Sequence, residues 1–141
     1  MKFLTLSLVA VYMFFGQSAI ADQDDLEARK QFVIDFYTDV ILFRDGNAID
    51  NYIGDTYIQH NPNLGDGKEE LRDFVGLNRR DEPTGEIVRV IAEGDLVVLH
   101  VRDFSGLAIM DIFRVAGCEI VEHWDVIQSI PEMSRNDNTM F

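Results

Sequence analysis

An aspartate inside an apolar segment is the first residue of this sequence that could do chemistry. Asp111 follows Ala108-Ile-Met110 and precedes Ile112-Phe113. Aspartate is disfavoured in the middle of a β-strand, and a buried carboxylate needs a charged or hydrogen-bonded partner. A carboxylate beside an imidazole in an apolar cavity can both give and take a proton. The sequence therefore predicts an acid/base site at Asp111.

His100 is the partner that the spacing of the turns predicts for Asp111. If Ser105-Gly106 is a two-residue turn, His100 lies directly opposite Asp111, with Cβ atoms about 5 Å apart. If Gly117-Cys118 is the next such turn, Asp111 also lies opposite Trp124. A slip of one residue would reverse either assignment. A polar pair that only stabilises the sheet is the alternative interpretation.

The same pairing predicts which side chains share a face of the sheet. One face would carry Val98, His100, Asp111, Phe113, Glu122 and Trp124, and the other Val97, Leu99, Ile112, Val121 and His123. Because His123 falls on the face opposite Asp111, we expect a structural or interface role for it. Glu122 and Arg114 are expected to be exposed charges at the rim of the sheet.

The third histidine lies in a polar segment that ends at a proline. The segment reads Tyr57-Ile-Gln-His-Asn-Pro62, and its first residues alternate like a strand. We expect His60, with Gln59 or Asn61, to lie at the mouth of a pocket and to hydrogen-bond a carbonyl oxygen. Alternation lets Gln59 and His60 both point inward only if the strand twists or ends there. Ordinary loop chemistry is the alternative.

The sequence gives little support for metal-dependent or nucleophilic catalysis. His60, His100 and Asp111 could form a metal site, but they come from distant segments without the close spacing of common metal motifs. The sequence has no phosphate-binding glycine loop and no G-x-S-x-G motif. Cys118 has no basic neighbour that would activate a thiol. We therefore expect no metal and no cofactor, with a metal-dependent enzyme as an alternative.

The spacing of apolar residues, which predicts the elements that position these side chains, changes along the chain. Helical spacing predicts helices over 24–44, 47–53 and 67–78, and a period of two predicts strands over 86–93, 96–103, 107–115 and 120–128. A short strand is expected within 56–60. Helices followed by one antiparallel meander predict an α+β fold. We expect a cone-shaped barrel, in which N-terminal helices cover a curved antiparallel sheet around a cavity.

The N-terminus has the pattern of a secretory signal peptide. Lys2 precedes a mostly apolar run from Phe3 to Phe15, and Ala19-Ile-Ala21 resembles a cleavage site. The run is shorter than the roughly 20 residues that cross a bilayer. We expect a signal peptide over 1–21, a single domain over 22–133, a tail over 134–141 and a secreted or periplasmic protein. A net charge of −13 disfavours binding to nucleic acid or anionic membranes.

Four segments together resemble the SnoaL-like polyketide cyclase family. They are YIQHNP at 57–62, DGKEELRDF at 66–74, RVIAEGDLVVLHVR at 89–102 and DIFRVAGCEIVEHWDVIQ at 111–128. The resemblance is closest to the predicted aldol-condensation-catalysing branch of this family, in the nuclear transport factor 2-like superfamily. It implies a conical α+β barrel with a deep apolar pocket, often dimeric through the sheet. It also implies an aspartate acid/base, at the position matched by Asp111, that works without metal or organic cofactor.

These observations lead to a hypothesis about function. We expect acid/base catalysis, of the aldol or isomerase type, on a small and largely apolar carbonyl compound, by a homodimer. Asp111 would move the proton, His100 would share it and His60 would bind the carbonyl oxygen. The substrate-binding residues would be Tyr57, Gln59, Asn61, Phe113 and Trp124. The alternative is a binding domain without turnover, which fits the export signal better.

Overall fold

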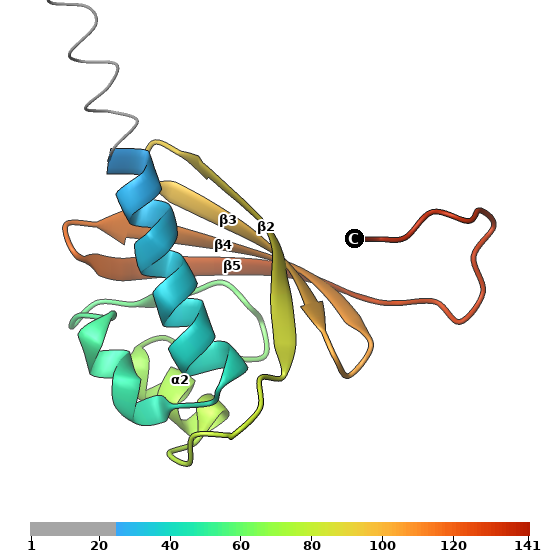
Figure 1. Cartoon of the computed structure of the whole chain (residues 1–141). Coiled ribbons are helices and arrows are strands. Elements are labelled where there is room, and N and C mark those ends of the chain that lie inside the picture. The colour runs from blue at the N-terminus through green and yellow to red at the C-terminus, as the bar shows by residue number, and fades with distance from the viewer. Residues whose placement is uncertain (1–24) are drawn as a thin grey trace, which may run out of the picture.

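The computed structural model describes residues 25–141, in which helices are followed by a five-stranded sheet (Figure 1). The signal peptide predicted over 1–21 lies outside the described residues. Residues 25–36 form an α-helix that continues as the π-helix η1 (Tyr37–Leu42), and the 3-10 helix η2 (Gly46–Asn51) and the helix α2 (Lys68–Val75) follow. The predicted α+β fold with N-terminal helices is confirmed. None of the helices in this part of the chain is long and apolar enough to span a membrane.

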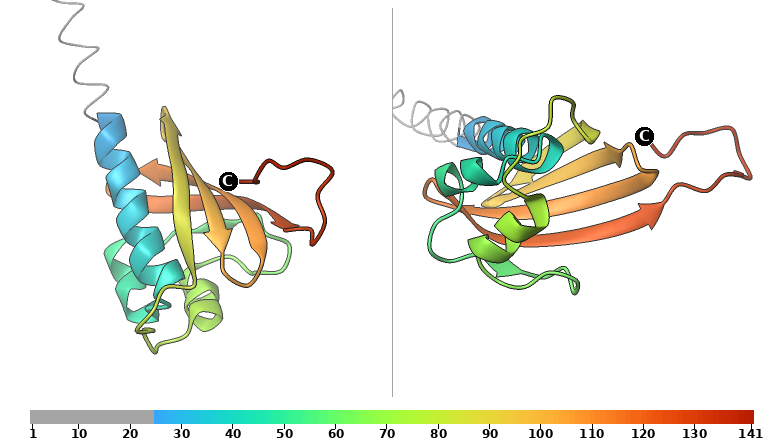
Figure 2. Two further views of the ribbon diagram at one scale, coloured as in Figure 1. Left: turned by 45° about the vertical axis from the view of Figure 1, so that its right-hand side comes forward. Right: turned by 90° about the horizontal axis from the view of Figure 1, so that it is seen from below.

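The sheet has the strand order β1-β5-β4-β3-β2. The strands are β1 (Ile58–Gln59), β2 (Gly85–Glu93), β3 (Leu96–Asp103), β4 (Leu107–Ala116) and β5 (Glu119–Ser129). Strands β2 to β5 form the predicted antiparallel meander, whereas the short β1 pairs in parallel with β5. The sheet is curved, and the helices cover one of its faces (Figure 2).

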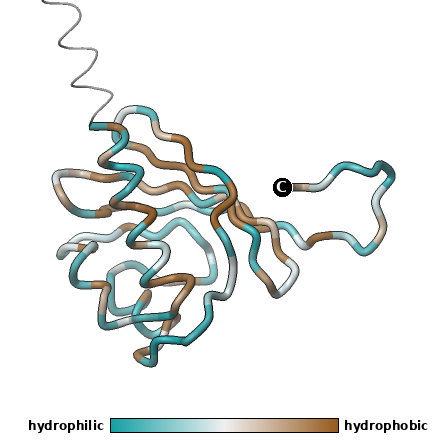
Figure 3. The backbone as a smooth tube through the Cα atoms, in the orientation of Figure 1, coloured by the Kyte–Doolittle hydropathy of each residue, from teal (hydrophilic) through white to brown (hydrophobic). Residues whose placement is uncertain are grey.

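The core lies between the long helix and the covered face of the sheet. Val33, Phe36 and Val40 are fully buried on the helix, and Val97, Leu99 and Phe113 are buried on the strands. The rings of Phe36 and Phe113 meet edge to face, with centroids 5.5 Å apart. Figure 3 shows apolar residues recurring along this helix and filling the central strands. Each such side chain contributes about 1.5–3 kcal/mol when it is fully buried.

The long helix changes its geometry where it approaches the sheet interior. From Tyr37 to Leu42 it is a π-helix, and its last turn ends with a bond from the Phe43 amide to the Thr38 carbonyl. A π-helical turn shifts the register of the buried face by a fraction of a turn. Both Tyr37 and Leu42 are buried as a result. The sequence pattern predicted an uninterrupted helix over 24–44 and gave no sign of this widening.

The predicted register of β3 against β4 is wrong by one residue. The connection consists of three residues, 104–106, rather than the predicted Ser105-Gly106 turn, because Asp103 pairs with Leu107. Gly106 adopts a φ of 97°, which suits the last position of a three-residue hairpin loop. Asp111 therefore lies opposite Leu99, and His100 lies opposite Met110.

The register of β4 against β5 also differs from the prediction, for another reason. The Gly117-Cys118 turn has the predicted two residues, since Ala116 pairs with Glu119. A β-bulge then leaves Val121 unpaired and shifts every later pair by one residue. Asp111 therefore lies opposite Asp125 instead of Trp124.

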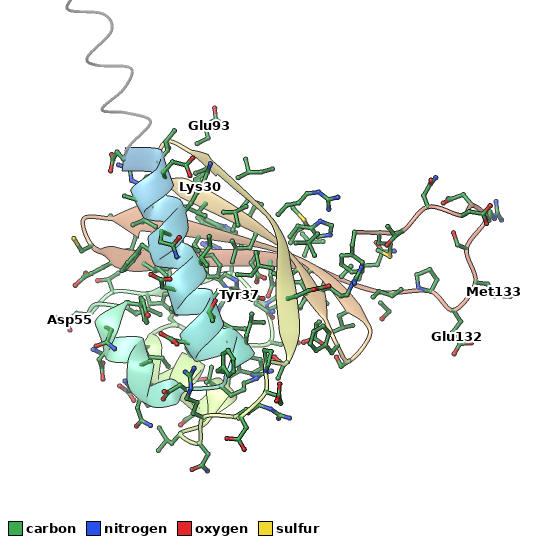
Figure 4. All side chains as sticks on the ribbon, in the orientation of Figure 1. Lys30, Tyr37, Asp55, Glu93, Glu132 and Met133 are labelled. Atoms are coloured by element: carbon green, nitrogen blue, oxygen red, sulfur yellow. The ribbon has the colours of Figure 1, made fainter. Side chains whose placement is uncertain are left out.

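The outer face of the sheet is not covered by any helix of the described residues. The tail first runs away from the sheet, past Glu132 and Met133 (Figure 4). Phe141 then returns and stacks on the His100 ring, with centroids 5.2 Å apart. The Arg102 guanidinium lies over the same Phe141 ring, 4.3 Å from its centroid.

Candidate functional site

A buried hydrogen-bonded pair of Asp111 and His123 forms the centre of the site. The side chains of both are more than 90% buried, and Asp111 Oδ1 lies 3.0 Å from His123 Nε2. The Tyr37 hydroxyl donates a hydrogen bond of 2.7 Å to Asp111 Oδ2. The bulge in β5 produces this pairing, because it turns His123 rather than Trp124 toward the covered face of the sheet.

The hydrogen bonds around His123 determine where its protons lie. The backbone amide of Asn61 donates to Gln59 Oε1, so this oxygen is an acceptor. The same oxygen lies 2.9 Å from His123 Nδ1, which must therefore carry a proton. Nε2 then faces Asp111 Oδ1, and their contact requires one more proton. The Asp111–His123 pair thus holds a shared proton, which can lie on either residue.

Two buried tyrosines surround this pair. Burial, followed by the charge of Asp111, raises the pKa of Tyr37 well above its ordinary value. Burial and the same charge also raise the pKa of Tyr57. Both hydroxyls therefore stay protonated under ordinary conditions. Gln59 Nε2 lies 3.5 Å from the Tyr57 oxygen, and the Tyr57 proton has no acceptor among the described residues.

A second carboxylate lies beside the pair. Asp125 is the cross-strand partner of Asp111, and its Oδ2 accepts a 2.6 Å hydrogen bond from Asn61 Nδ2. Asn61 itself is oriented by the backbone amide of Asn63, which donates to Asn61 Oδ1. One ligand atom from each of Asp111, His123 and Asp125 lies within 4.8 Å of the others, a spacing that would suit a bound cation. A metal ion there would have to displace the proton shared by Asp111 and His123.

These residues line a cavity of about 440 Å³ between the helices and the sheet. Most of the lining side chains are aliphatic or aromatic, among them Phe36, Leu71, Val101, Ile109 and Phe113. Figure 4 locates Tyr37 in the lower half of the long helix. Its hydroxyl reaches Asp111 on strand β4 from the helix side of the cavity. A small apolar molecule with one or two polar groups would match this lining.

Five of the predicted site residues come together in this cavity. Tyr57, Gln59, Asn61, Asp111 and Phe113 all line it. Gln59 and Asn61 contact His123 and Asp125 directly, so the polar segment at 57–62 does contribute to the site. Whether these residues bind a substrate stays a prediction.

His100 does not join Asp111, and the predicted pair is wrong. The three-residue loop places His100 on the outer face of the sheet, where the Arg89 guanidinium donates to its Nδ1 over 2.9 Å. His123, expected on the face opposite Asp111, is the histidine that bonds to it. Both imidazoles were thus predicted on the wrong face, His100 because of the three-residue loop and His123 because of the bulge in β5.

His60 and Trp124 also lie outside the cavity, contrary to their predicted places at its mouth and wall. Their rings stack on the outer face, with centroids 4.6 Å apart and planes inclined by 4°. His60 Nε2 lies 2.8 Å from Glu122 Oε1, and Arg114 binds Glu122 Oε2 over 2.6 Å. These bonds from His60 and Arg114 hold the pKa of Glu122 below its ordinary value. Alternation along the chain thus turns Gln59 and Asn61 inward and His60 outward.

Three residues of the site were missed by sequence reasoning, namely Tyr37, His123 and Asp125. Tyr37 lies on the apolar stripe of the helix and looks like an ordinary core residue. His123 and Asp125 alternate around Trp124, so a correct register would have found both at once. The bulge at Val121 hid them, because bulges have no short sequence signature as clear as that of a turn.

The family of the chain follows from its sequence. The profile of the SnoaL-like domain matches residues 33–123, well over half of the chain. The chain belongs to the SnoaL-like domain family. The match extends from the long helix to His123 and so includes most of the cavity described above. No curated protein sequence matches this SnoaL-like chain.

Three solved structures have a fold similar to that of this SnoaL-like domain. TsrD from Streptomyces laurentii is 18% identical, with a TM-score of 0.55 over 71% of this chain and 88% of its own. A candidate polyketide cyclase from Acidithiobacillus ferrooxidans is 18% identical, with a TM-score of 0.53 over 70% and 87%. An NTF-2 like protein of unknown function from Burkholderia xenovorans LB400 is 19% identical, with a TM-score of 0.51 over 79% and 85%. At these identities the similarity concerns the fold.

Proposed function

We propose that this SnoaL-like protein catalyses proton transfer next to a carbonyl group, in an aldol-type cyclisation or an isomerisation. The observation that carries the proposal is the buried 3.0 Å contact between Asp111 Oδ1 and His123 Nε2 within a mostly apolar cavity. A positioned carboxylate–imidazole pair can accept a proton from carbon and later return it. The fold similarity to a candidate polyketide cyclase is consistent with the proposal, although that fold hosts many functions.

The proposed step begins with the carboxylate of Asp111. It removes a proton from the carbon next to the substrate carbonyl, so that a C–H bond breaks and an O–H bond forms. The electron pair moves onto the carbonyl oxygen, where the Tyr57 hydroxyl donates a hydrogen bond to the developing charge. Return of the proton to another carbon completes an isomerisation, and attack of the enolate on a second carbonyl completes an aldol reaction. His123 and Tyr37 keep the carboxylate oriented throughout.

Tyr57 replaces His60 as the donor to the carbonyl oxygen in this proposal. Its hydroxyl is buried and lines the cavity. Because burial raises its pKa, it remains a hydrogen-bond donor at neutral and mildly alkaline pH. A donor in such a dry site is worth more than the same donor in water.

Deuterium exchange of an enolisable ketone in D2O tests the proposal. We expect the wild-type protein to accelerate exchange next to the carbonyl of 4-benzylcyclohexanone. The Asp111→Asn variant should lose about 10²-fold or more of that acceleration. Asp103→Asn is the matched control, since Asp103 also lines the cavity but is hydrogen-bonded to Ser105. An unchanged exchange rate in a folded Asp111→Asn variant would reject the acid/base role.

A binding domain without turnover is the second candidate. It is favoured by the position of His60, whose ring lies on the outer face and not beside Asp111. In this case the ketone would bind to wild type, yet exchange would be no faster than in buffer. Export across a membrane and homodimer formation remain predictions for either candidate.

A further inference from the structure

We infer that Asp125 selects ligands that carry a positively charged amine close to their carbonyl group. The inference deepens the proposed function, because it concerns the ligand of the same cavity. It rests on three features of Asp125, namely its position opposite Asp111, its lack of a cationic partner among residues 25–141 and its orientation by Asn61.

The position of Asp125 brings two carboxylates together. Asp111 and Asp125 are directly opposed on β4 and β5, and their side chains point to the same covered face. Carboxylates directly opposite each other in a sheet destabilise it by mutual repulsion. The carboxylate of Asp125 is therefore unfavourable for the sheet, which indicates that this residue has a role beyond stabilising the fold.

The charges around the two carboxylates do not balance. The proton shared with His123 compensates one negative charge, and Tyr37 adds a neutral hydrogen bond to Asp111. Asp125 receives only the neutral amide of Asn61, and no lysine or arginine of residues 25–141 forms an ion pair with it. One negative charge therefore remains on the half-buried Asp125 at the wall of a largely apolar cavity, where an uncompensated charge is costly.

Asn61 also fixes the direction in which Asp125 can bind a ligand. Because the amide of Asn63 donates to Asn61 Oδ1, the Nδ2 group of Asn61 must face Asp125 Oδ2. The other oxygen of Asp125, Oδ1, has no hydrogen bond to the described residues and lies on a residue that lines the cavity. It is thus a preformed acceptor for a donor on the ligand.

The chemistry that fits this acceptor is a protonated amine. An ammonium group would restore the charge balance and would donate to Asp125 Oδ1 in a charge-assisted bond. The ligand atoms of Asp111, His123 and Asp125 lie within 4.8 Å of one another. The nitrogen must therefore lie within a few bonds of the carbon that loses its proton. A ligand carrying a carboxylate or phosphate at this position would be repelled by both aspartates.

Two probes of nearly equal shape test the inference at pH 6. 1-Benzyl-4-piperidone carries a protonated ring nitrogen, whereas 4-benzylcyclohexanone has carbon at the same position. We expect wild type to bind the piperidone about tenfold more tightly or better, as measured by ligand-observed NMR titration. In Asp125→Asn the preference should disappear while the affinity for the cyclohexanone is kept. The Asp103→Asn control should keep the preference.

Several outcomes would overturn the inference. Equal affinity of the two probes for wild type would do so, as would a preference that survives both Asp125→Asn and Asp125→Ser. One-to-one binding of Zn²⁺ or Mn²⁺ that is abolished by Asp125→Asn, without any preference between the probes, would assign the carboxylate to a metal ion instead. Exchange lost in Asp111→Asn but no preference for the amine would retain the proposed function and reject this inference. A preference for the amine without catalysed exchange would retain the inference alone.

Discussion

Among the residues of the site, Tyr37 connects the long helix to Asp111 through a single hydroxyl group. It is buried, it comes from the wall opposite the sheet and it is the only tyrosine of the described residues that donates to Asp111. Without it, Asp111 Oδ2 would be buried with no donor from the described residues. The Tyr37–Asp111 bond therefore links the helix to the acid/base pair.

Replacing Tyr37 with phenylalanine should weaken both stability and exchange. Phenylalanine keeps the ring packing against Phe113 but removes the hydrogen bond to the carboxylate. We expect the free energy of unfolding to fall by about 1.5–3 kcal/mol, because the bond is charge-assisted. Urea unfolding measures the first effect and deuterium exchange of 4-benzylcyclohexanone the second. A variant as stable as wild type would show that the hydroxyl contributes nothing to Asp111.

Asp111 itself could be predicted from the sequence, whereas its partners could not. A carboxylate between isoleucine, methionine and phenylalanine residues is unusual enough to be noticed without any structure. Its partner depends on strand register, which changes with every loop length and bulge. The three-residue loop before β4 and the bulge at Val121 each moved one histidine to the other face.

At the scale of elements, the segment of Gln59, His60 and Asn61 depends on contacts on both faces of the sheet. His60 is stacked on Trp124 and bonded to Glu122, and its amide donates to the His123 carbonyl. Gln59 and Asn61 meanwhile reach His123 and Asp125 from the cavity side. The outward histidine thus anchors a short edge strand that pairs with β5 through only two residues.

His60→Ala should therefore disturb the cavity although His60 lies outside it. We expect a loss of about 1 kcal/mol in stability from the exposed stack and ion pair, together with slower ketone exchange. The ¹⁵N shift of His123 Nδ1 should also change, because its bond to Gln59 loosens. His100→Ala is the control, since His100 is a stacked histidine on the same outer face. Equal effects of the two variants on the His123 signal would contradict an anchoring role.

In the molecule as a whole, the spacing of apolar residues along the sequence was enough to predict the order of helices and strands. The four long strands begin and end within one residue of their predicted limits. Amphipathic alternation and turn residues are local signals, so one sequence suffices to find them. The π-helical turn and the bulge are responses to packing, and local signals do not report them.

The fold also protects its tyrosines from ionisation, with a consequence for stability in alkali. Burial raises the pKa of Tyr37 and Tyr57, and it raises that of Tyr52 to about 12. An unfolded tyrosine ionises near pH 10. The stabilisation is therefore complete below about pH 10 and is lost as the pH rises toward the folded pKa values.

We expect the free energy of unfolding to fall steeply above pH 10. Tyr37 and Tyr57 should each contribute a slope of about 1.4 kcal/mol per pH unit. Urea unfolding between pH 8 and pH 11.5, with tyrosinate absorbance followed in parallel, measures this slope. Tyr37→Phe should reduce the slope, whereas a profile identical to wild type would argue that Tyr37 ionises normally in the folded protein.

The unpaired Val121 has a consequence for how this protein can change. Substitutions in β5 alter one side chain at a time, but loss of the bulge, with Val121 pairing with Arg114 in place of Glu122, would turn over every residue after it. Glu122 and Trp124 would then enter the cavity, while His123 and Asp125 would face solvent. The chemistry of the cavity thus depends on one unpaired residue. Deletion of Val121 would keep His123 opposite Phe113 and Asp125 opposite Asp111, whereas a regular strand of the same sequence would erase the site while keeping every side chain.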